Sequence, residues 1–66
     1  MEELFKVEFI GYKGRDVVSM MLYENVSTED YQAHFTGDPK KYILENHPNG
    51  ANLDIERAFS VLSLNK

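Results

Sequence analysis

The side chains of this 66-residue chain that could carry acid–base or metal chemistry are few and far apart. The only histidines are His34 and His47, and the absence of cysteine excludes a thiolate nucleophile and a thiolate zinc site. A metal needs three or four converging ligands, and no spacing of His, Asp and Glu suggests them. A serine triad would need a cleft that so short a chain has little room to build. We therefore expect no catalytic residue, no metal, no cofactor and no enzymatic activity.

The carboxylates are distributed unevenly. The net charge is −4, and the twenty-four residues between Arg15 and Lys40 contain no Lys or Arg. The acidic residues in that segment are Asp16, Glu24, Glu29, Asp30 and Asp38. One interpretation is a solvated surface that keeps a small protein dissolved. The other is an acidic surface directed at a basic partner, because complementary fields raise association rates roughly 10- to 1000-fold.

The charge balance also narrows the class of partner. Nucleic-acid binding depends on clustered Lys and Arg, whereas this chain has seven basic and eleven acidic residues. No apolar run approaches the roughly 18 residues of a membrane span, and the acidic N-terminal residues do not resemble a secretory signal. We expect a cytoplasmic protein that binds another protein, and neither nucleic acid nor a membrane.

A single domain over residues 1–66 must position these side chains. A chain near this length buries only about 60% of its surface on folding, so a homodimer would add useful burial. Alternating apolar and polar residues predict a strand over 3–10, a glycine loop over 11–15 and a second strand over 16–24. Both faces of the second strand are apolar. We therefore expect a helix on one face of the sheet and, on the other, a second protomer.

A helix start follows the second strand. Ser27 can accept a hydrogen bond from the backbone N–H of Asp30, and the Asp30 carboxylate can reach back in a variant of the capping box. Tyr31 and Phe35 are spaced to share one helix face. Gly37 is expected to end this helix.

The remaining segments predict a second helix and a third strand. Asp38-Pro39 is a typical helix start, and two helical turns would follow over 40–46. Residues 55–64 fit helical and strand periodicity, and we favour a strand because three strands make the smallest stable sheet. Met20-Met21 is expected to fill the core. The fold class is therefore α+β in the order ββααβ, with a helix packed on a three-stranded antiparallel sheet.

The hairpin and the capped aromatic helix together resemble a known family, the small, acidic, homodimeric uracil-DNA glycosylase inhibitors of Bacillus phages. That family has the pattern Ser-x-x-Asp-Phe-x-x-x-Tyr, and this chain has Ser27, Asp30, Tyr31 and Phe35 in the matching places, with the aromatic types exchanged. The resemblance covers roughly residues 5–38 and, more loosely, the last strand. This chain differs in having a glutamine, Gln32, at a position where the family has a carboxylate, and in a longer connection over residues 39–52.

The resemblance implies an inhibitor that imitates DNA. Glycosylases flip the uracil out of the stack and insert an apolar wedge into the minor groove. Carboxylates would replace the phosphates, and the helix aromatics, paired with their copies across a dimer axis, would form a socket for the wedge. The implied binding residues are Glu24, Glu29, Asp30, Tyr31, Gln32, Phe35 and Asp38. The aromatic spacing fits equally well a pair that packs the helix on the sheet. A different acidic phage or plasmid protein, which inhibits a host nuclease or another nucleic-acid-binding protein, fits the same composition.

Overall fold

The first half of the chain forms a long antiparallel hairpin. The computed structural model describes residues 3–64, in which a two-residue turn, Gly14-Arg15, joins β1 (Leu4–Lys13) to β2 (Asp16–Ser27). Gly14 has a φ of +61°, a conformation that is costly for any residue with a Cβ. The predicted five-residue loop over 11–15 was therefore too long, because β1 continues through its first three residues.

Gly11 lies within β1, where the absence of a side chain makes room for Ile55. A Cβ on Gly11 would lie 3.1 Å from the Cδ1 atom of Ile55, which is buried. The ladder is irregular just beyond this point, where Gly11 pairs with Ser19 and Tyr12 pairs with Val17. The residue between these two on β2 has no partner on β1, as in a β-bulge.

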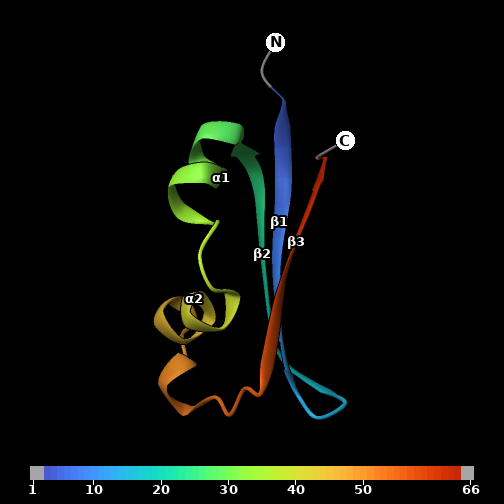
Figure 1. The fold of residues 1–66 in the computed structure, drawn as a ribbon, viewed down its shortest axis with the longest axis vertical. Helices are drawn as coiled ribbons and strands as arrows, with labels where there is room; N and C mark the ends of the chain where they lie inside the picture. The colour runs from blue at the N-terminus through green and yellow to red at the C-terminus, as the bar shows by residue number, and fades with distance from the viewer. Residues whose placement is uncertain (1–2, 65–66) are drawn as a thin grey trace.

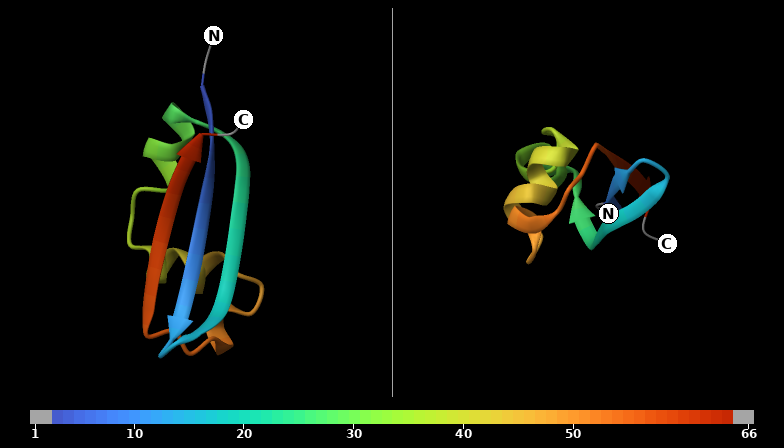
Figure 2. Two further views of the ribbon diagram at one scale, coloured as in Figure 1. Left: turned by 90° about the vertical axis from the view of Figure 1, so that its right-hand side faces the viewer. Right: turned by 90° about the horizontal axis from the view of Figure 1, so that it is seen from below.

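β3 (Arg57–Leu64) completes a three-stranded antiparallel sheet of order β2-β1-β3. The prediction of a strand in the last segment is confirmed, although it begins at Arg57 and leaves Ile55 free to fill the core. The left view of Figure 2 shows the three strands side by side with β1 in the centre and the helices behind them. The predicted α+β fold of order ββααβ is thus confirmed.

α1 (Thr28–His34) begins at the predicted cap, where the Ser27 hydroxyl accepts the backbone N–H of Asp30 at 3.1 Å. The prediction that Gly37 ends this helix was wrong by two residues. Phe35 is the C-cap, with a φ of −122° outside the helical range, and its side chain packs against the core. Figure 1 shows α1 beside the upper end of the sheet.

α2 (Pro39–Asn46) also begins as predicted, since Oδ1 of Asp38 accepts the backbone N–H of Lys40 at 3.1 Å. The helix lies against the same face of the sheet as α1 and buries Ile43 completely (Figure 1). A short 3-10 helix, η1 (Gly50–Asn52), then leads toward β3. Within residues 3–64 no helix is long and apolar enough to cross a membrane.

The core lies between the helices and the sheet. Its buried apolar members are Val7, Phe9, Val26, Ile43 and Ile55. The Phe9 ring stacks on Tyr42 with centroids 4.4 Å apart and planes inclined by 15°. Burial, together with a hydrogen bond to Tyr23, raises the pKa of Tyr42 to about 12.

The two methionines take opposite sides of the sheet. Met21 packs against the core, whereas Met20 is 61% exposed on the face that carries no helix. The prediction that both fill the core was therefore wrong for Met20, because neighbouring residues of a strand point to opposite faces.

Candidate functional site

The charges of the molecule are segregated along its 40 Å length. Around the hairpin turn, three basic residues accompany three acidic ones, and α2 with its cap contains two of each sign. The residues of the hairpin-turn group are Lys13, Arg15, Arg57, Asp16, Asp54 and Glu56. The rest of the described chain, toward α1, contains Lys6 as its single basic residue and five acidic residues. The net charge of −4 therefore belongs to the α1 half of the molecule.

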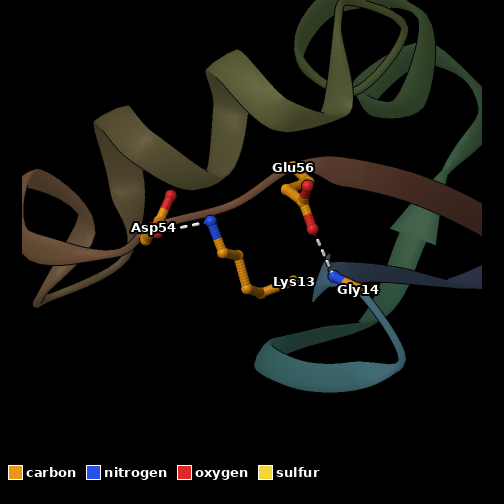
Figure 3. Close-up of polar contacts among 4 residues, drawn as sticks. All are labelled: Lys13, Gly14, Asp54 and Glu56. Atoms are coloured by element: carbon orange, nitrogen blue, oxygen red, sulfur yellow. Dashed lines mark hydrogen bonds and ion pairs between the residues drawn. The ribbon is translucent and has the colours of Figure 1, made fainter.

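Polar contacts hold the hairpin turn against the segment that enters β3 (Figure 3). The Nζ atom of Lys13 lies 2.7 Å from Oδ2 of Asp54, and the Glu56 carboxylate accepts the backbone N–H of Gly14. Arg57 donates to the Gly14 carbonyl at 3.1 Å. The hydrogen bond and the negative charge of Asp54 raise the pKa of Lys13. These charges balance one another, so they stabilise the turn and leave little net field for a partner.

Exposed carboxylates gather at the opposite end of the sheet. The Ser27 cap places Glu29 and Asp30 in the first turn of α1, where the helix dipole favours negative charge, and Glu24 lies three residues before the cap on β2. Because Leu4 pairs with Ser27, Glu3 lies at the same end, which the sequence analysis missed since only strand register reveals it. We call these four acidic residues the acidic end.

The carboxylates of the acidic end have no ion-pair partner among the residues that the structure describes. Within residues 3–64 the one ion pair joins Lys13 to Asp54, far from α1. The predicted return bond from the Asp30 carboxylate to the Ser27 backbone is not formed in the described chain, where the cap is a single bond from the Asp30 N–H. All four carboxylates belong to exposed residues. Carboxylates without an ion-pair partner are available to an incoming basic surface.

The aromatic pair of α1 is only partly available to a partner. Tyr31 and Phe35 are both half-buried and pack against the core. The Phe35 ring lies 5.1 Å from Tyr23, 5.6 Å from Tyr42 and 6.0 Å from Phe9, between ring centroids. The packing interpretation of the spacing therefore describes Phe35. Tyr31 has no partner among these ring contacts and lies next to the acidic end.

The two remaining residues of the expected binding surface, Gln32 and Asp38, lie in different parts of the structure. Gln32 is exposed on α1 directly after Tyr31. Asp38 lies past the end of α1, where its carboxylate caps α2 and is followed by Lys40 and Lys41. The structure therefore brings Gln32, but not Asp38, to the acidic end.

The histidines occupy unrelated positions. His34 is exposed in the last turn of α1, with its ring 6.4 Å from that of Phe35. His47 follows α2, and its Nδ1 atom accepts the backbone N–H of Asn49 at 3.1 Å. Among residues 3–64 there is no group of three His, Cys, Asp or Glu side chains that could hold a metal ion.

Comparison with protein-family models, curated proteins and solved structures finds no match to this chain. Its function must therefore be argued from the acidic end and the surfaces around it.

Proposed function

We propose that this chain is a phage protein that inhibits the uracil-DNA glycosylase of its bacterial host by imitating DNA. The observation that supports the proposal most directly is the acidic end, whose four exposed carboxylates form no ion pair with any residue of the described range 3–64. The DNA-binding cleft of a glycosylase carries basic and polar groups that contact phosphates. Carboxylates held on a short capped helix would occupy the same groups and steer the encounter.

Tyr31 supplies the apolar contact of this proposed surface. Tyr31 follows Asp30 directly on α1 and its side chain is half-buried, so an apolar wedge residue of the glycosylase could pack against the exposed part of its ring. Burial of a leucine-sized side chain contributes roughly 1.5–3 kcal/mol. Phe35 is less accessible to the wedge residue, because its ring packs against Tyr23 and Tyr42 within the protomer. The inhibitor acts as a homodimer in the host cytoplasm and needs no cofactor.

A titration tests the target. The purified chain is added to several bacterial uracil-DNA glycosylases acting on uracil-containing DNA, and we expect uracil excision to cease near stoichiometric amounts. A variant in which Glu29→Gln and Asp30→Asn are combined should inhibit less well at low salt, whereas Glu45→Gln on α2 serves as the matched control. An absence of inhibition at stoichiometric excess for every glycosylase would overturn the proposal. Affinity capture from a bacterial lysate would then show whether the partner is a nuclease or another nucleic-acid-binding protein.

A further inference from the structure

The face of the sheet away from the helices is apolar and uncovered. Side chains that alternate with the core residues point to this side, and direct cross-strand partners share it: Ile10 pairs with Met20 on β2 and with Phe59 on β3. The left view of Figure 2 looks onto this face. We call it the open face, and its apolar members are Leu4, Ile10, Tyr12, Val17, Met20, Leu22, Phe59 and Val61.

The open face is as large as a small dimer interface. Six of its apolar side chains, those other than Ile10 and Tyr12, are 38–61% exposed. A large side chain that is half exposed presents roughly 100 Å², so these six present on the order of 600 Å². The smallest specific interfaces bury about 600 Å² on each partner, and monomeric proteins seldom expose a larger apolar patch. Two stacked sheets normally lie about 10 Å apart, with strands aligned to within about 30°.

The charges on the open face select one orientation for a second copy. Glu8 lies on β1 two residues from Ile10, and Lys6 lies two residues further along the same face. On the other side of Ile10 lies Tyr12, whose ring has the Arg57 guanidinium 5.7 Å from its centroid. A two-fold axis across the strands at Ile10 stacks the sheets with strands antiparallel. That axis places Glu8 of each copy over Tyr12 and Arg57 of the other. A two-fold axis along the strands would instead stack Glu8 on Glu8 and Lys6 on Lys6, two like-charge contacts.

The long-range charge distribution favours the same orientation. The net negative charge belongs to the α1 half, whereas acidic and basic residues balance around the hairpin turn. Antiparallel stacking sets the acidic end of each copy over the balanced hairpin end of the other. Parallel stacking would bring the two acidic ends together, and their fields would repel.

We infer that the open face is the interface with a second copy of this chain, stacked with its strands antiparallel about a two-fold axis near Ile10. The inference rests on the proposed homodimer and is independent of the proposed target. The helices then lie on the two outer surfaces, and the acidic ends lie at opposite ends of the dimer. Each acidic end meets a separate partner molecule, so the complex contains two inhibitor chains and two partner molecules.

Sedimentation equilibrium tests the interface through one leucine. The wild-type chain should sediment at twice its 7.6 kDa mass at micromolar concentrations. Leu22→Lys, on the open face, should give a monomer with an unchanged circular dichroism spectrum, because this side chain is 55% exposed in the protomer. Leu44→Lys is the matched control, since Leu44 is an exposed leucine on α2, and this variant should remain dimeric. A monomeric wild-type chain, or a dimer that survives Leu22→Lys, would overturn the inference.

A charge-reversal cycle tests the orientation. Glu8→Arg and Arg57→Glu should each raise the dimer dissociation constant tenfold or more, and the combined variant should return it to within a few-fold of the wild-type value. Arg57 also donates to the Gly14 carbonyl, so folding of each variant is checked by circular dichroism. If the combined variant fails to recover while remaining folded, the antiparallel arrangement is wrong.

The dimer interface and the proposed target can fail independently of each other. A chain that dimerises through the open face but does not inhibit any glycosylase leaves the interface standing and overturns the target. A chain that inhibits a glycosylase but remains dimeric after Leu22→Lys supports the target and overturns the interface.

Discussion

A Cβ on Gly50 would lie 2.3 Å from the carbonyl oxygen of Leu44, a distance at which real atoms cannot coexist. Gly50→Ala must therefore displace η1 from the end of α2, and we expect a loss of about 1–3 kcal/mol in the free energy of unfolding. Urea denaturation followed by circular dichroism, at one fixed protein concentration, measures it.

Gly37→Ala is the control for this substitution. A Cβ at Gly37 has nothing within 4 Å, and Gly37 is not in the left-handed region. Its unfolding free energy should change by less than about 0.5 kcal/mol or rise slightly, because alanine restricts the unfolded chain. Equal losses from both variants would contradict the close approach of Gly50 to Leu44.

Ser19 is a buried residue whose hydroxyl has no hydrogen-bond partner within residues 3–64. Ser19→Ala removes a desolvated polar atom without loss of a bond, so the free energy of unfolding should increase by about 1 kcal/mol. Ser60→Ala, at an exposed position on the same side of the sheet, should change it little. A lower stability for Ser19→Ala would mean that the hydroxyl is bonded after all.

Tyr42 should make the fold sensitive to alkaline pH. Its pKa is raised from 10.0 to about 12, so between these values the unfolded chain loses the phenolic proton before the folded chain does. Stability therefore falls as pH rises through this range, and below pH 10 the residue has no effect. Lys13, whose pKa is also raised, adds a loss of the same sign.

Comparison with Tyr42→Phe isolates the contribution of Tyr42, because Lys13 is unchanged in both proteins. The difference in unfolding free energy between wild type and variant should shrink steadily from pH 10 to pH 12. Denaturation curves at half-unit pH intervals measure this change, and two parallel pH profiles would contradict the prediction.

Tyr31 and Glu29 should affect inhibition in different ways. Tyr31→Ala removes the apolar contact and should weaken the complex more than Glu29→Gln does, mainly through faster dissociation. Glu29→Gln should slow association and reduce its dependence on salt. Stopped-flow binding at two ionic strengths separates the rates, with Tyr31→Phe as the packing control. Losses of equal size and equal salt dependence would contradict this division.

The local features of the fold could be predicted from the sequence because neighbouring residues determine them. The Ser27 and Asp38 caps formed at the expected residues, since a cap needs only a side chain and an amide two or three positions away. The place of Gly11 inside β1 could not be predicted, because it depends on Ile55, far along the chain.

The candidate site was predictable in part for the same reason. Glu29, Asp30, Tyr31 and Gln32 are contiguous on one short helix, so their proximity follows from the cap. Glu3 lies beside them because of the register of β1 with β2. The Phe35 ring packs inside the protomer against Tyr23 and Tyr42. Both depend on tertiary contacts that periodicity does not encode.

The position of β1 between β2 and β3 has a consequence for how the chain acquires its structure. Phe5, near the start of the described chain, pairs with Leu64 at its end. One of the two ladders that β1 forms therefore joins residues that are far apart in the sequence. Such topologies fold slowly, because a long loop must close before its contacts stabilise anything. During synthesis the hairpin emerges first, and one edge of β1 stays unpaired until β3 has left the ribosome. The sheet is therefore expected to be complete only after β3 has been synthesised and can pair with β1.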